Sequence, residues 1–150
     1  MDTIDIKILR ALDENARQKA SAISQQVGLS VSAVIERIHK LEDNGVIAGY
    51  TAVLNQKRLG HGISAWMGVW LEHPRCCDAF TAQIQLMDNV LDCIYLTGDF
   101  DFLLHVAASS SEALESIHRQ LKKIDGVSAI KTHIVLKDVK RGGCLLPELN

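Results

Sequence analysis

Apolar residues recur every three or four positions in three segments of the N-terminal part of the chain, which predicts three helices. The predicted ranges are 3–14, 20–26 and 31–44. Gly28 suits a sharp turn before the third helix, and Ser30 can cap that helix by accepting a hydrogen bond from a free backbone N–H. Gly45 suits the position just past its end. Helices joined by a glycine-containing turn in this way indicate a helix-turn-helix.

Short extended segments follow the third helix. Residues 46–50 and 51–54 are rich in strand-forming side chains and suit a small β wing. Residues 55–62 are polar and contain two glycines, which is typical of a linker between domains. We therefore predict a winged helix-turn-helix domain over 1–54 and a linker over 55–62.

The C-terminal part combines strand patterns with helix patterns. Runs of β-branched and aromatic residues predict strands, and apolar residues at helical spacing predict helices. The strands are expected at 63–72, 90–97, 102–107 and 127–137, and the helices at 76–87 and 111–123. The order β-α-β-β-α-β is that of a ferredoxin-like domain. The chain is thus predicted to be an α+β protein with a second domain over 63–140 and a tail over 141–150.

The two predicted helices of this domain can cover only one face of its sheet. The other face is expected to carry apolar residues, drawn from either the Trp66/Trp70 set or the Met67/Val69 set. An apolar sheet face without cover indicates a partner surface. A homodimer is the simplest way to cover it.

Composition and charge limit the classes of function that the chain can have. The 150 residues are 47% apolar and 23% charged, as in an ordinary folded domain, and their net charge is −2. Residues 1–60 hold eight basic and seven acidic side chains. This balance excludes nucleic-acid binding by bulk positive charge but leaves room for a local binding surface. No segment has the length of a membrane helix or the pattern of a signal peptide, so we expect a cytoplasmic protein with free thiols and no membrane partner.

Polar groups on the helix predicted at 31–44 suit DNA. Ser32, Arg37, His39 and Lys40 lie off its apolar stripe. A hydroxyl near a helix N-terminus can bond a phosphate, and Arg37 can pair with guanine or hold a phosphate. The alternative is a solvated face on which Arg37 and Lys40 pair with acidic residues of the same helix. Those residues are Glu36, Glu42 and Asp43.

Two strings of residues resemble the Lrp/AsnC (feast/famine) family of transcription regulators. Residues 2–12 follow the pattern D-x-x-D-x-x-I-L-R-x-L, and residues 27–47 follow V-G-L-S-x-S-x-V-x-x-R-I-x-x-L-E-x-x-G-V-I. The β-α-β-β-α-β order also resembles the RAM-type effector domain of that family. The chain departs from the family at the second helix, where a serine and, three residues on, an acid are usual but Lys19 and Ala22 stand. The start of that helix is expected to depend on Ser21 or on packing.

The resemblance implies a sequence-specific regulator of transcription that binds double-stranded DNA and responds to a small effector, for which an amino acid is expected. It implies a homodimer that assembles further to a tetramer or octamer, and it implies no cofactor and no metal. No catalytic motif is found, so an enzyme is not expected. The DNA-contacting residues are expected to be Ser30, Ser32, Ala33, Glu36, Arg37 and Lys40.

The segment Gly98–Asp99–Phe100–Asp101 matches the family's G-x-x-D turn, which the resemblance implies is part of the effector site. Glycine lets a backbone approach a ligand closely, free N–H groups suit a carboxylate, and Asp101 can hold an ammonium. The alternative is a plain hairpin turn in which Asp99 and Asp101 bond the local backbone. By resemblance alone, Thr132 and His133 are expected to face this turn, either from the sheet or from a neighbouring subunit.

Two other functions stay open from the sequence. One is an architectural protein that wraps or bridges DNA without any ligand. The other is a regulatory subunit of a metabolic enzyme, in which the helical part docks to a protein. An amino-acid response and salt-dependent DNA binding separate these alternatives from a ligand-responsive regulator.

Overall fold

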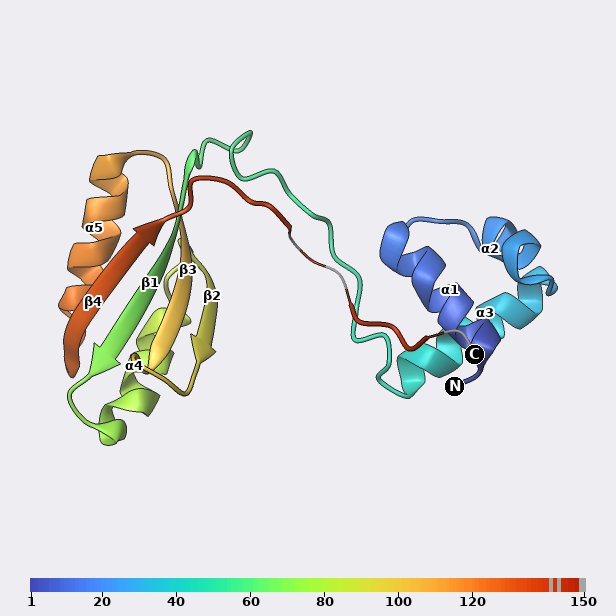
Figure 1. Cartoon of the computed structure of the whole chain (residues 1–150), viewed down its shortest axis with the longest axis horizontal. Helices are drawn as coiled ribbons and strands as arrows, with labels where there is room; N and C mark the ends of the chain where they lie inside the picture. Colours follow the sequence, from blue (N-terminus) through green and yellow to red (C-terminus); the bar gives the residue numbers. More distant parts are fainter. Residues whose placement is uncertain (141, 143, 149–150) are drawn as a thin grey trace. The chain divides into compact units, whose positions relative to one another are not determined.

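The computed structural model describes residues 1–140, 142 and 144–148, and these fall into two compact units (Figure 1). The first unit comprises Met1–Val53 together with the described residues from Lys140 onward, and the second comprises Leu54–Val139. None of the described helices is long and apolar enough to cross a bilayer. The chain therefore leaves the first unit after Val53 and returns to it at Lys140.

The first unit is built on three helices, which confirms the prediction from helical spacing. They are α1 (Thr3–Glu14), α2 (Ala20–Val27) and α3 (Val31–Asp43). Their inward faces form one apolar core, and Leu146 from the C-terminal segment packs against it. The buried members of this core are Ile8, Leu9, Ala11, Ile23, Val34 and Leu41.

Both ends of α3 are formed as the sequence predicts. The hydroxyl of Ser30 accepts a hydrogen bond from the backbone N–H of Ala33 at 3.2 Å. At the other end Gly45 has a positive φ of 69°, and its N–H donates to the carbonyl of Glu42. The two caps satisfy backbone groups that a helix leaves free at its ends. The length and position of α3 are thus set by its own sequence.

The start of α2 depends on packing. Lys19 occupies its N-cap position and makes no side-chain cap hydrogen bond. Ile23 is fully buried, and Ala20 packs against the core of the unit. Burial of the apolar face therefore holds α2 where no side-chain cap helps, as expected for most short helices in proteins.

The predicted β wing is wrong. Residues 46–54, all of which the structure describes, contain no strand. The N–H groups of Val46 and Ile47 instead donate to the carbonyl of Leu41 and finish the end of α3. Val53 is 97% exposed, so the segment gains little from burial. An isolated pair of short strands is marginal in water without such burial.

The second unit is a four-stranded antiparallel sheet with two helices. Its strands are β1 (Ile63–Leu71), β2 (Val90–Tyr95), β3 (Phe102–Ala108) and β4 (Val127–Ile134), in the order β2-β3-β1-β4 (Figure 1). Its helices are α4 (Cys77–Ile84), preceded by the 3₁₀ turn η1 (Pro74–Cys76), and α5 (Ser111–Lys122). This confirms the predicted β-α-β-β-α-β order. The first predicted helix, 76–87, is shorter in the structure, because residue 76 belongs to the 3₁₀ turn and α4 already ends at Ile84.

The faces of β1 show which apolar set lies under the helices. Met67 and Val69 are fully buried and belong to the same core as Phe80 of α4 and Leu121 of α5. Because alternate residues of a strand point to opposite faces, Trp66 and Trp70 lie on the face away from this core. We call this the open face; Trp66 and Trp70 are half-buried there. The core thus uses the Met67/Val69 set, and the open face carries the tryptophans.

Replacement of Gly126 by alanine should destabilise the second unit by roughly 2–4 kcal/mol. Gly126 precedes β4 with a φ of 87°, and a Cβ atom there would lie 2.6 Å from the Cβ and Sγ atoms of Cys76. Gly98→Ala is the matched control, because Gly98 also has a positive φ but an added Cβ meets no atom within 4 Å. It should cost only about 1–2 kcal/mol. Urea unfolding of both variants checks this, and equal losses would show that contact with Cys76 is unimportant.

Candidate functional site

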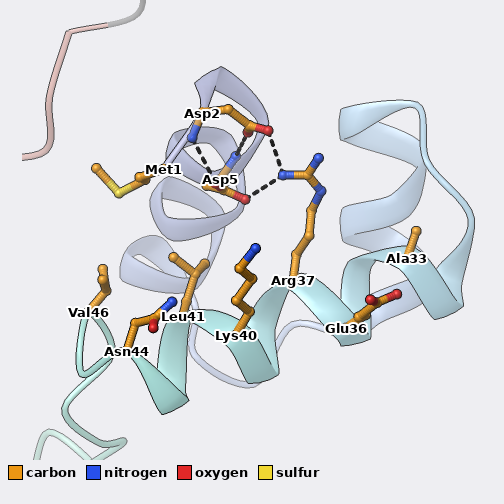
Figure 2. A pocket seen from close by; sticks show the side chains of 10 residues that line it. All are labelled: Met1, Asp2, Asp5, Ala33, Glu36, Arg37, Lys40, Leu41, Asn44 and Val46. Carbon is orange, nitrogen blue, oxygen red and sulfur yellow. Dashed lines mark hydrogen bonds and ion pairs between the residues drawn. The ribbon is translucent and has the colours of Figure 1, made fainter.

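The exposed face of α3 and the start of α1 enclose a cavity of about 530 Å³ (Figure 2). Its lining includes Ala33, Glu36, Arg37 and Lys40 of α3, which the sequence assigns to DNA contact. Glu36 and Lys40 are exposed, whereas Ala33 and Arg37 are half-buried. These four predicted residues therefore share one surface, but they differ in how accessible they are.

Arg37 is bonded to two carboxylates of α1. Its Nη1 donates to Oδ2 of Asp2 at 2.7 Å and to Oδ1 of Asp5 at 2.6 Å (Figure 2). The side chain is 31% exposed, and that of Asp5 is 14% exposed. The alternative of a pair between Arg37 and the acids of its own helix is wrong, because the acids that hold it come from α1.

The two carboxylates also close the N-terminus of α1. Oδ1 of Asp2 accepts a hydrogen bond from the N–H of Asp5 at 2.9 Å, and Oδ2 of Asp5 accepts one from the N–H of Asp2 at 2.8 Å. This is a reciprocal capping box with aspartate at both positions. Each carboxylate thus uses one oxygen for the cap and the other for Arg37.

These contacts shift two ionisation equilibria in the direction that favours the charged forms. The N–H of Asp5 and, next, the Arg37 guanidinium lower the pKa of the Asp2 carboxyl. Hydrogen bonds to Asp2 and Asp5 raise the pKa of Arg37. Asp2 and Arg37 are therefore both held in their charged forms by these contacts.

Three other polar residues of α3, which are Ser32, Lys40 and Glu42, differ from Arg37 in their partners. Ser32 is exposed, and its hydroxyl lies 3.1 Å from that of Ser30, which caps the helix. Lys40 makes no ion pair with any residue that the structure describes. Glu42 accepts a hydrogen bond from the hydroxyl of Tyr50 at 2.7 Å. Burial and this bond raise the pKa of Tyr50 to about 12. Lys40 is therefore the cation of α3 that is open to an anionic partner.

The turn between β2 and β3 is attached to β1 through Asp101. Its Oδ2 accepts a hydrogen bond from the N–H of Leu71 at 2.7 Å, and its own N–H donates to the carbonyl of Val69 at 3.0 Å. The bond to Leu71 lies where the register of β1 with β4 shifts. Asp101 thus bonds backbone, as the plain-turn alternative expects, although the backbone belongs to a neighbouring strand.

The remaining residues of the turn are free to meet a ligand. Gly98 has a φ of 132°, and Gly98 and Asp99 are exposed. The N–H groups of residues 97–100 donate to no acceptor in the described part of the chain. The ring of Phe100 lies over Gly68, since an added Cβ there would be 3.0 Å from it, and meets Trp70 edge-on at 5.6 Å. The turn therefore borders the open face.

Thr132 and His133 lie on opposite faces of β4. Thr132 is paired with Met67, and its hydroxyl lies 3.3 Å from Nδ1 of His118 on α5. His133 is paired with Trp66 and is exposed on the open face. Within one chain the two residues therefore do not line a common surface. The neighbour that shares the open face with Phe100 is Lys131, which is paired with Gly68.

Sequence reasoning missed Lys131 and Trp70 as neighbours of the turn. The strand alternation that places Trp70 beside Trp66 also places Lys131 and His133 on that face. The alternation within each strand can be seen in the sequence. The positions that lie side by side also depend on the register between β1 and β4. The register follows from long-range pairing that a single strand does not reveal.

A buried histidine connects the open face to β2. His105 is 6% exposed, its Nε2 lies 2.8 Å from the hydroxyl of Ser64, and its Nδ1 lies 3.0 Å from Oδ2 of Asp92. The ring of Trp66 stacks on it at 4.6 Å. Both ring nitrogens thus have partners, so His105 is a satisfied polar group in the sheet rather than a free base.

Comparison with known families agrees with both units. The model of the AsnC-type helix-turn-helix domain matches residues 1–42, and that of the Lrp/AsnC ligand binding domain matches residues 64–145. A leucine-responsive regulatory protein of Haemophilus influenzae is 34% identical over 149 residues, covering 97% of this chain and 90% of that protein.

Solved structures show the same architecture. A transcriptional regulator of Neisseria meningitidis in complex with L-methionine has a TM-score of 0.91 and 31% identity, covering 100% of this chain and 97% of its own. A feast or famine regulatory protein of M. tuberculosis complexed with L-methionine has a TM-score of 0.90 and 29% identity, covering 97% of this chain and 99% of its own.

Replacement of Asp101 by alanine should lower the stability of the second unit by about 1–3 kcal/mol, because it leaves the half-buried N–H of Leu71 without its acceptor. Asp101→Asn keeps an oxygen at that position and should cost less than half as much. Thermal unfolding of both variants measures the difference. An alanine variant as stable as the wild type would show that Asp101 is free for a ligand and does not hold the turn to β1.

Proposed function

Because the chain belongs to the Lrp/AsnC family of transcriptional regulators, we propose that it binds specific double-stranded DNA through α3 and responds to an amino acid. The observation that carries the DNA proposal is the capped helix α3, whose exposed face carries Ser32, Glu36 and Lys40. This is the arrangement expected of the second helix of a helix-turn-helix.

The side chains of this face suit the major groove. The ammonium of Lys40 can bind a phosphate or the acceptors of guanine, and the carboxylate of Glu36 can accept from the amino group of cytosine. The hydroxyls of Ser30 and Ser32 lie at the N-terminus of α3, where the helix dipole favours a phosphate. Few cations contribute, so one unit alone binds weakly, and several must act together.

The effector proposal rests on the turn at 98–101 and on the two related structures solved with L-methionine. The free N–H groups of the turn suit a carboxylate. Phe100 and Trp70 offer an apolar wall to a side chain, and the exposed Lys131 shares that face. An amino acid supplies both a carboxylate and a side chain, so it is the ligand class proposed here.

A homo-oligomer is part of the proposal. The open face carries Trp66 and Trp70, and its edge strand adds Ile94, which is 46% exposed. A second copy would cover this apolar area and bring two helix-turn-helix units to two half-sites. We place the protein in the cytoplasm, where DNA and amino acids meet, and assign it no enzymatic activity and no cofactor.

Lys40→Ala should weaken specific DNA binding by about 1–3 kcal/mol and reduce the dependence of log K on log salt by about one unit. The probe is a duplex selected by the wild-type protein from random-sequence DNA. Lys7→Ala is the matched control, because Lys7 is an exposed cation on α1 that does not line the cavity beside α3. Fluorescence anisotropy from about 50 to 200 mM salt provides the measurement. Equal losses in both variants would contradict the assignment of α3.

A panel of the twenty amino acids should include at least one that stabilises the protein. A ligand present at about 100 times its Kd adds about 2.7 kcal/mol to the free energy of unfolding. Differential scanning fluorimetry with the full chain detects this, and Gly98→Ala should abolish the shift. If no amino acid stabilises the protein while DNA binding persists, a ligand-independent architectural role replaces the effector proposal. If salt-dependent DNA binding is also absent, a regulatory subunit of an enzyme is favoured.

A further inference from the structure

We infer that Arg37 is a positioning residue for DNA recognition: it fixes the middle of α3 against the start of α1 and does not itself contact the bases. The inference rests on the proposed function, since it concerns how α3 is presented to DNA. It replaces the sequence-based interpretation in which Arg37 binds a guanine or a phosphate.

The capping box of α1 holds the two carboxylates that accept hydrogen bonds from Arg37. The capping box holds one oxygen of Asp2 and one of Asp5 on backbone N–H groups, and this orients their remaining oxygens toward Nη1 of Arg37. The two bonds of 2.7 and 2.6 Å are in the range of charge-assisted hydrogen bonds. The contact therefore joins α3 to a rigid helix terminus rather than to mobile side chains.

The electrostatics disfavour a phosphate at the same guanidinium. A phosphate that approached Arg37 would also approach the carboxylates of Asp2 and Asp5, each within 2.7 Å of Nη1. An end-on bidentate contact with guanine would use both Nη1 and Nη2, and Nη1 is already bonded to the two carboxylates. Lys40 lies one helical turn further along α3, and it makes no ion pair with the described residues. Arg37 is therefore assigned to positioning α3, and Lys40 to contact with DNA.

Arg37 adds a directional restraint to the packing that holds α3. Val34 and Leu41 anchor the helix through hydrophobic burial, which is non-directional, whereas a hydrogen bond also restrains direction. Base contacts require side chains to be held within about 0.5 Å. A directional bond from Arg37, midway between Val34 and Leu41, supplies that restraint. Asp2 and Asp5 thereby influence DNA recognition although they are anionic.

The test uses the direction in which DNA affinity changes when the negative charges of Asp2 and Asp5 are removed. Asp2→Asn with Asp5→Asn keeps an oxygen for each cap bond, because asparagine is as good an N-cap as aspartate, but removes both charges that hold Arg37. Simple electrostatics predicts tighter DNA binding after the loss of two negative charges. A positioning role predicts the opposite, a loss of about tenfold or more in affinity for the selected duplex. The control is Asp13→Asn with Glu14→Gln, which makes the same charge change at the other end of α1.

Affinities of the full chain for the selected duplex and for a scrambled duplex are measured across salt concentrations. Arg37→Ala and the Asp2/Asp5 double variant should each lower the ratio of specific to non-specific affinity, with the salt dependence unchanged. The triple variant should bind no more weakly than Arg37→Ala, because all three residues act as one unit. Arg37→Lys should recover part of the loss. Circular dichroism confirms that each variant is folded, and the aspartate variants carry the test if Arg37→Ala unfolds.

Three results would overturn the inference. The first is that the Asp2/Asp5 double variant binds the selected duplex more tightly, as its control is expected to do. This would show that the carboxylates only keep Arg37 from contacting DNA. The second is a salt dependence reduced by about one unit in Arg37→Ala, which indicates a direct phosphate contact. The third is a wild-type protein that enriches no sequence from random DNA, and this result alone also contradicts the proposed function.

Discussion

Two helices can cover only one face of a four-stranded sheet, and the second unit of this chain depends on that constraint. The side chains of Met67 and Val69 are fully buried on the face that α4 and α5 cover. The alternate residues Trp66 and Trp70 therefore remain only half-buried on the open face. The aromatic area and the turn at 98–101 both lie on the side that the helices leave uncovered, which is the surface proposed for a second copy.

Local patterns in the sequence were sufficient for most of the fold. Helical spacing located α1, α2 and α3, and the caps at Ser30 and Gly45 follow from residues adjacent to the helix ends. The β-α-β-β-α-β order follows from strand and helix patterns of ordinary length. The prediction of a wing at 46–54 was wrong, because residues with strand propensity do not form a strand without burial or a cross-strand partner. Propensity is thus a guide only where packing supports it.

The sites were harder to predict because their contacts join residues far apart in sequence. Arg37 is bonded to aspartates 35 and 32 positions earlier, although acids on its own helix are nearer along the chain. Asp101 bonds the N–H of Leu71, which is 30 positions away. Thr132 and His133 are adjacent in sequence but lie on opposite faces of β4. Residue type indicates what chemistry a side chain can perform, but the tertiary partner decides whether that capacity is already used.

The return of the chain to its first unit affects how that unit folds. Leu146 packs on the same core as Ile8, Ile23 and Val34, and the whole of Leu54–Val139 lies between them in sequence. The second unit is therefore an insertion within the first. During synthesis on the ribosome the three helices emerge early, but Leu146 can pack on their core only after the second unit has been made. The last packing contact of the first unit therefore forms after the second unit has left the ribosome.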